Sequence, residues 1–183
     1  MMLRAFGVLF LASLLNGCGG AVPAESRTLD LGLAAPAATL PAVRIGSVRA
    51  VTPFESTDMQ YRLAYRNAAE ISVFANSRWA ASPAELLRKQ LLRAANDKPG
   101  KCALDIEIHE FTQMFSAKET SEARIELRAW LGAGASRANS RGWSIVEANA
   151  GADALSGAAA FARAANRAIG ELGAWIAEQP LCR

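Results

Sequence analysis

The chain has 183 residues, a length that fits one domain, and its 20 Lys and Arg residues nearly balance 17 Asp and Glu. The basic residues are spread along the chain without a Lys/Arg block, so nucleic acid is not expected as a partner. A single His excludes zinc sites built on two or three His. We therefore expect neither a metal site nor a cofactor.

The first eighteen residues have the features of a bacterial export signal. Arg4 supplies the positive charge, and the apolar run that follows over residues 5–15 is too short to span a bilayer. The run ends in Leu15-Asn16-Gly17-Cys18, which resembles the lipobox of bacterial lipoproteins. In that class the signal is cut before the cysteine, whose thiol and new amine then carry acyl chains. A plain secretory signal with an incidental cysteine is the alternative.

The lipobox resemblance implies a signal peptide over residues 1–17 and a lipid anchor at Cys18 in the cell envelope. Gly19 follows, and by resemblance to lipoprotein sorting in Gram-negative bacteria the lack of Asp there favours the outer membrane, facing the periplasm. Residues 18–42 are rich in Ala, Gly and Pro, so we expect an acylated N-terminus and a flexible tether, with residues 28–31 as a candidate edge strand. A single periplasmic domain is expected over residues 43–183.

Two further cysteines, Cys102 and Cys182, would lie in the same oxidising compartment. A pair in such a compartment predicts a disulfide, here closing a loop of about 80 residues and contributing about 2–4 kcal/mol. Two free buried thiols are the alternative.

The first half of the domain reads as strands followed by a helix. Residues 43–51 form a β-branched run whose phase slips at Gly46-Ser47, which predicts a bulge. Alternation over residues 59–65 and 71–75 predicts a β-hairpin, with Tyr61 and Tyr65 on the buried side. Ser82 then predicts a helix start, with Pro83 and Glu85 in the first turn and an end near residues 96–100.

The second half repeats this order. Residues 102–115 predict a long strand with a phase change at His109-Glu110, and residues 124–131 predict its neighbour. A Gly/Ala/Ser-rich loop is expected at 132–142, a last strand at 143–148, and an amphipathic helix from Asp153 to Glu178. This order predicts a two-layer α+β fold, with a mostly antiparallel sheet and two amphipathic helices on one face.

The sequence offers no catalytic constellation. A nucleophilic triad would need His109, and there is no Gly-x-Ser-x-Gly elbow, P-loop or Gly-x-Gly-x-x-Gly motif. Glu107 and Glu110 differ in strand parity and would converge only if a bulge turns them, so a glycosidase pair stays open. We expect a protein that is not an enzyme.

Two tryptophans stand out as contacts. Trp79 precedes the first helix and is expected to pack beneath it. Strand parity places Trp130 with Arg124, Glu126 and Arg128 on the face away from the helices, where it is a candidate contact for a partner or another subunit. Coverage of Trp130 by the tether or by a loop is the alternative.

A family resemblance rests on Tyr61-Arg62 in the first hairpin strand, followed by Arg78-Trp79-Ala80 running into the helix at Ser82-Pro83. These residues resemble the ABC-type transport auxiliary lipoproteins, the PqiC/YmbA-like group, and residues 43–48 resemble the family's opening strand. The resemblance covers specific residues over 43–96 and the rest by pattern.

The resemblance implies an auxiliary, non-catalytic lipoprotein beside an ABC permease, an ATPase and a mammalian-cell-entry (MCE) domain protein, which move lipids between inner and outer membranes. A homo-oligomer is also compatible with this role. The rival interpretation is a free-standing envelope assembly or scaffolding lipoprotein that docks on an outer-membrane protein. A third, a lipoprotein hydrolase, would depend on His109.

Overall fold

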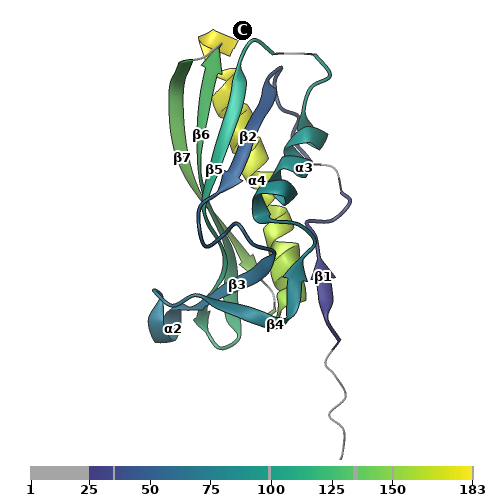
Figure 1. Ribbon diagram of the computed structural model, residues 1–183, viewed down its shortest axis with the longest axis vertical. Coiled ribbons are helices and arrows are strands. Elements are labelled where there is room, and N and C mark those ends of the chain that lie inside the picture. The colour runs from purple at the N-terminus through teal and green to yellow at the C-terminus, as the bar shows by residue number, and fades with distance from the viewer. Residues whose placement is uncertain (1–24, 35, 99, 134–135, 150, 183) are drawn as a thin grey trace, which may run out of the picture.

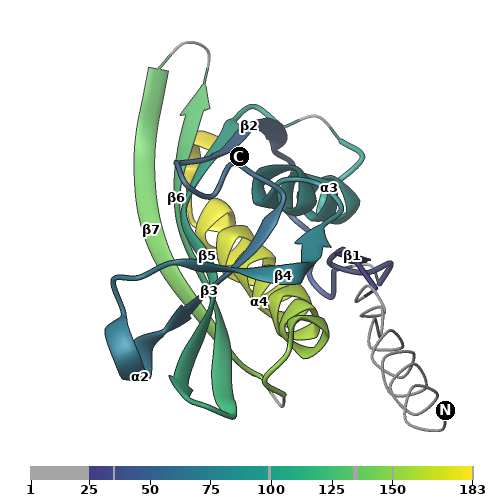
Figure 2. The same cartoon turned by 60° about the horizontal axis from the view of Figure 1, so that its bottom comes forward.

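The computed structural model describes residues 25–34, 36–98, 100–133, 136–149 and 151–182; the expected signal peptide, Cys18 and the first part of the tether lie outside them. One open sheet carries two long helices on a single face (Figures 1 and 2). The strands are β1 (Arg27–Leu29), β2 (Arg44–Ala50), β3 (Asp58–Leu63), β4 (Ser72–Trp79), β5 (Ala103–Ala117), β6 (Thr120–Ala133) and β7 (Ser136–Asn149). The helices are α2 (Ala64–Asn67), α3 (Pro83–Ala94) and α4 (Ala154–Ala177), followed by one 3-10 turn, η2 (Pro180–Cys182).

Strand β5 organises the sheet. Along one edge it pairs antiparallel with β6, which in turn pairs with β7. Its other edge is shared, because β2 pairs in parallel with the first half and β3 in parallel with the second. Strand β3 then carries β4, and β4 carries β1. The molecule therefore has two halves that meet along β5, as Figure 1 shows.

Two bulges confirm the predicted phase changes. The register of β2 against β5 shifts between Ile45 and Val48, and that of β5 against β6 shifts between Ile108 and Glu110. One extra residue at His109 resets the parity of β5, so its apolar residues before and after the bulge all face the helices. These buried residues are Leu104, Ile106, Ile108, Phe111 and Phe115.

Both long helices begin as predicted. The Ser82 hydroxyl accepts the Glu85 backbone N–H at 3.4 Å, and Pro83 lies in the first turn of α3. Asp153 and Ser156 form a capping box at the start of α4. Helix α3 packs on β2, and α4 packs on β6 and β7, which confirms the two-layer α+β fold. Within the described ranges, no helix combines the length and apolar character needed to cross a membrane.

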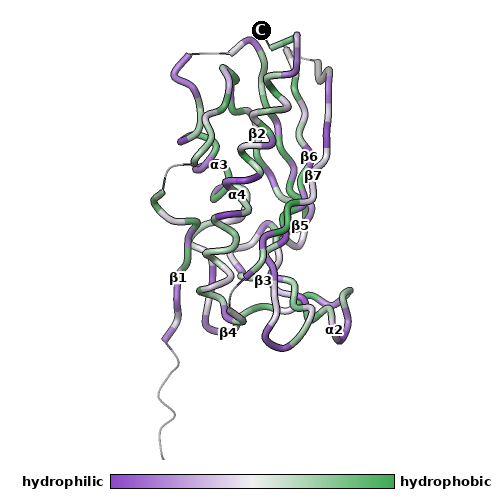
Figure 3. The backbone as a smooth tube through the Cα atoms, turned by 180° about the vertical axis from the view of Figure 1, so that it is seen from behind, coloured by the Kyte–Doolittle hydropathy of each residue, from purple (hydrophilic) through white to green (hydrophobic). Residues whose placement is uncertain are grey.

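Two expectations about the strands are corrected. Residues 136–142, expected as loop, form the first part of β7, because backbone pairing with β6 compensates for a run of small and polar residues. Figure 3 shows the hydrophilic character of this part of β7, which lies at the edge of the sheet next to β6. Tyr65 lies in α2 and is exposed, since the chain leaves β3 at Leu63.

The expectation of a flexible tether is corrected as well, because residues 27–34 and 36–42 lie against the domain. The candidate edge strand is confirmed as β1, which pairs in parallel with β4. Leu31 and Leu40 are buried, and the Leu40 backbone N–H donates to the Ala94 carbonyl at 2.7 Å. These two leucines bury apolar surface that a free tether would leave in water.

Candidate functional site

Trp79 of the family-like motif lies in the centre of an aromatic cluster. Its side chain is 1% exposed, and its ring meets Phe111 at 5.6 Å and Phe161 at 5.3 Å, both edge to face. Phe111 stacks on Phe161 with ring centroids 4.4 Å apart. Trp79 is buried as expected, and its ring contacts join β4 to β5 and α4, so the residue attaches the β3–β4 hairpin to the rest of the domain.

Arg62 makes a second attachment of the same hairpin to β5. Its Nε and Nη2 each donate to one carboxylate oxygen of Glu110, both at 2.9 Å, and both side chains are largely buried. Its Nη1 donates to the carbonyls of Ala68 and Ala69 at 3.1 and 3.3 Å. A bidentate Arg–carboxylate pair is the strong form of an ion pair. Arg62 thereby fastens β3 and the turn after α2 to β5.

The two remaining residues of the family-like motif are Tyr61 and Arg78. Tyr61 packs on Phe74 and Phe115, with ring centroids 4.7 and 5.9 Å away. Arg78 is exposed on β4, where its backbone is in register with Asp58 of β3. Tyr61, Arg62 and Trp79 therefore attach the β3–β4 hairpin to the rest of the domain. The side chain of Arg78 is displayed to solvent.

The sheet face opposite the helices carries a network of charges. Glu107 accepts from Arg49, whose Nη2 lies 2.6 Å from Oε2, and His109 Nε2 lies 3.1 Å from Oε1. On β6, Arg124 Nη2 lies 2.8 Å from Glu122, a hydrogen bond that raises the pKa of the Arg124 guanidinium. Exposed pairs of this kind contribute little stability. Their arrangement defines a polar surface.

The bulge does place Glu107 and Glu110 on this same face, since Glu107 is in register with Arg128 and Glu110 with Glu126. Each carboxylate is nevertheless engaged by a different arginine, Arg49 for Glu107 and Arg62 for Glu110. Within the described ranges, no group of three or more His, Cys, Asp or Glu residues is arranged to hold a metal ion.

Trp130 lies on this polar face, half-buried, in register with Asp105 of β5 and Ser140 of β7. A cavity of about 460 Å³ opens farther along the same strands, and His109, Glu126, Arg128 and Ser144 are among the residues that line it. Both long helices pack on the opposite face. The role of Trp130 as a partner contact stays a prediction.

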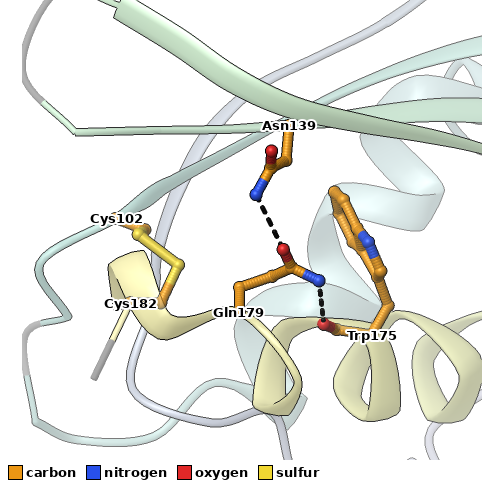
Figure 4. Close-up of a disulfide and its surroundings, with 5 residues drawn as sticks. All are labelled: Cys102, Asn139, Trp175, Gln179 and Cys182. Atoms are coloured by element: carbon orange, nitrogen blue, oxygen red, sulfur yellow. Dashed lines mark hydrogen bonds between the residues drawn. A yellow bond between two sulfur atoms is a disulfide. The ribbon is translucent and has the colours of Figure 1, made fainter.

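The C-terminus is fastened at the far end of the molecule (Figure 4). Cys102 at the start of β5 and Cys182 in η2 lie at disulfide-bonding distance, with Cα atoms 5.1 Å apart across 80 residues of sequence. Gln179 Nε2 donates to the Trp175 carbonyl at 3.1 Å, and Asn139 Nδ2 donates to Gln179 Oε1 at 2.7 Å. The C-terminal turn is thus held to both β5 and β7.

A second surface, which sequence reasoning missed, lies at the opposite end beside β1. A cavity of about 510 Å³ separates β4 from the start of α4 and is lined by Arg27, Phe74, Asp153 and Leu155 among others. An adjoining groove of about 230 Å³ runs between the chain after β1 and α4. The sequence feature that could have indicated this surface is the pair of leucines, Leu33 and Leu155, which lie outside the predicted apolar stripes.

Comparison with known proteins finds solved structures with the same fold, but no matching family model or curated sequence. Among solved structures, a Xanthomonas campestris protein described as a member of the family DUF330 superposes with a TM-score of 0.69 at 19% identity, covering 82% of this chain and 94% of that one. This chain shares the fold of that DUF330 protein.

A second solved structure, described as an uncharacterized protein, superposes with a TM-score of 0.63 at 10% identity, covering 83% of this chain and 99% of that one. At these identities the likeness concerns the fold alone. The likeness extends over 82% and 83% of this chain, so it is not confined to a single segment.

Proposed function

We propose that this protein is a lipid-anchored auxiliary subunit of an ABC/MCE-type lipid transport system, held at the outer membrane and facing the periplasm. One observation carries the proposal: the chain has the fold of a DUF330 protein and the Tyr61-Arg62 and Arg78-Trp79 motif of the ABC-type transport auxiliary lipoproteins. DUF330 is the family designation of that PqiC/YmbA-like group.

The contacts of the motif support this assignment. Tyr61, Arg62 and Trp79 each join elements from different parts of the chain, so they are residues on which this fold depends. A chance match on exposed positions would have no such role. The lipobox at Cys18 adds an independent feature that the same family shares.

A non-catalytic role agrees with the engagement of the acidic and basic residues. His109 is half-exposed and paired with Glu107, which also holds Arg49. A general base must lie within hydrogen-bond reach of the group that it deprotonates, and the Ser144 hydroxyl, which lines the same cavity as His109, donates to Glu126 at 3.5 Å. In the proposed system the ATPase supplies the energy, and this protein supplies attachment at the outer membrane.

The test is a pull-down of an MCE-domain partner from intact membranes that express the full chain. We expect capture by the unaltered protein and a loss of about ten-fold or more with Trp130→Ala, if Trp130 is a central contact. His109→Ala on the same face serves as a matched control and should retain capture.

Capture of an outer-membrane protein in place of the MCE protein would overturn the proposal in favour of the scaffolding role. Hydrolase activity lost in His109→Ala would favour the third interpretation. The membrane attachment is measured separately, because Cys18→Ser should move the protein from the membrane to the soluble fraction.

A further inference from the structure

Two leucines are displayed to solvent near the groove between the chain after β1 and α4. Leu33 is 86% exposed in the turn after β1, and Leu155 is 54% exposed in the first turn of α4. Gly32 and Leu155 line the same groove, together with apolar residues of both segments: Leu29, Leu31, Ala158, Ala159 and Ala162. We call Leu33, Leu155 and this groove the β1 surface.

The turn that displays Leu33 is held in a defined shape. The Asp30 carboxylate accepts from the Gly32 N–H and from Lys89 Nζ, the latter at 2.6 Å, and this hydrogen bond to Lys89 lowers the pKa of Asp30. Arg93 Nη1 donates to the Gly32 carbonyl at 3.0 Å. Gly32 has φ 85°, a left-handed conformation that glycine adopts without strain. Leu33 is therefore presented by an ordered turn.

The β1 surface lies next to the point where the chain arrives from Cys18. Glu25 and Arg27 line the cavity that Leu155 also lines. Cys18 precedes Glu25 by seven residues, which reach at most about 25 Å when fully extended. Acyl chains on Cys18 would hold this end of the domain close to the bilayer, while the Cys102–Cys182 end lies at the opposite end of the molecule (Figure 1).

We propose that the β1 surface rests on the lipid bilayer, with Leu33 and Leu155 at the boundary between headgroups and acyl chains. This inference depends on the lipid anchor of the proposed function. The anchor keeps the leucines at a high effective concentration next to the membrane, so a small apolar surface suffices for contact. The domain then stands with its disulfide end directed away from the bilayer, which sets the direction from which a periplasmic partner approaches.

The experiment uses the full acylated chain reconstituted in phosphatidylethanolamine/phosphatidylglycerol vesicles that contain brominated lipid as a quencher. An environment-sensitive thiol dye is placed by Leu33→Cys, by Leu155→Cys or, as the control at the disulfide end, by Ser140→Cys. We expect quenching at positions 33 and 155 to exceed that at position 140 by about two-fold or more. Equal quenching at the three positions overturns the inference.

A second measurement guards against a local effect of the dye. Leu33→Asp should reduce quenching of a dye at position 155 by about two-fold, because a carboxylate at the surface disfavours contact with the acyl region. Leu181→Asp, an exposed leucine near the disulfide, should leave it unchanged. An unchanged signal in Leu33→Asp counts against the inference.

The outcome separates this inference from the proposed function. If Cys18→Ser leaves the protein on the vesicles, the lipid anchor itself is wrong. If Cys18 is required for attachment but positions 33, 155 and 140 respond alike, the anchor stands and the orientation is wrong. The pull-down of the MCE protein does not enter either result.

Discussion

The two halves of β5, before and after the bulge at His109, are held by different physical means. Before the bulge the strand contributes aliphatic side chains such as Leu104 and Ile106, pairs with β2, and directly follows Cys102 of the disulfide pair. After the bulge it contributes Phe111 and Phe115, pairs with β3, and joins the aromatic cluster of Trp79.

The second half also contains buried polar contacts. Gln113 Nε2 donates to the Ser121 hydroxyl at 2.9 Å. Gly157 of α4 lies so close to Gln113 that a Cβ atom at position 157 would be 2.2 Å from Gln113 Oε1. The small β3–β4 hairpin buries too little surface to be stable alone. Aromatic packing and the Arg62–Glu110 pair supply the missing attachment, which explains why the family-like motif falls in this half. A single inserted residue lets one strand serve both kinds of packing.

The largest loss of stability is expected when the aromatic cluster around Trp79 is disrupted. Trp79→Ala should lower the free energy of unfolding by about 3–5 kcal/mol, because it leaves a cavity against Phe111 and Phe161. Urea denaturation followed by circular dichroism measures this loss. Trp79→Phe keeps part of the ring packing and should lose less. A loss in Trp79→Ala no larger than that of Trp130→Ala would contradict the role of the cluster.

The next effect concerns the first half. Replacing both Cys102 and Cys182 by Ala should cost about 2–4 kcal/mol, because the unfolded chain is released from a closed loop of 80 residues. Thermal denaturation with and without reductant provides the measurement. Reductant should destabilise the unaltered protein to the level of the double variant and leave the variant unchanged. Two alkylatable thiols in protein purified without reductant would show that the pair does not bond.

A smaller effect tests the ion pair of the second half. Arg62→Met should cost about 1–3 kcal/mol, because Glu110 would be left largely buried without its bidentate partner. Arg49→Met is the matched control on the exposed Glu107 pair and should cost about 0–1 kcal/mol. Chemical denaturation of both variants gives the comparison, and equal losses would contradict the structural role of Arg62.

The smallest effect lies at the start of α4, where the two halves meet the same helix. Asp153→Ala should cost about 1 kcal/mol at neutral pH through loss of the N-cap. The backbone hydrogen bond from Ser156 lowers the pKa of Asp153 from its usual 3.8. A lowered pKa means that the ionised carboxylate stabilises the folded state fully above about pH 4 and loses this effect as the pH falls through the folded pKa.

Asp153→Asn is the control, since it keeps a capping oxygen without a titrating carboxyl. The stability difference between the unaltered protein and Asp153→Asn should shrink as the pH falls below 4, as measured by denaturation at a series of pH values. A difference that grows on acidification would contradict the lowered pKa.

Local features of this fold were predictable from the sequence. The bulges at Gly46-Ser47 and His109-Glu110 show as phase slips in an otherwise regular alternation, and the start of α3 at Ser82 shows in its capping residues. The pairing of Cys102 with Cys182 followed from their number and expected compartment. Trp79 was predicted to be buried because of its place before a helix, although its partners Phe111 and Phe161 were not identified.

The sequence by itself determined what depends on neighbours along the chain: periodicity, caps, bulges and the fold class with two helices on one face. Only the tertiary structure decided which strands share β5, the inclusion of β1 in the sheet, and the exposure of Leu33 and Leu155 at one end. Strand pairing depends on hydrogen bonds between residues far apart in sequence, and these override weak local signals such as the small residues of β7. Surface patches arise in the same way, because they combine residues that only folding brings together.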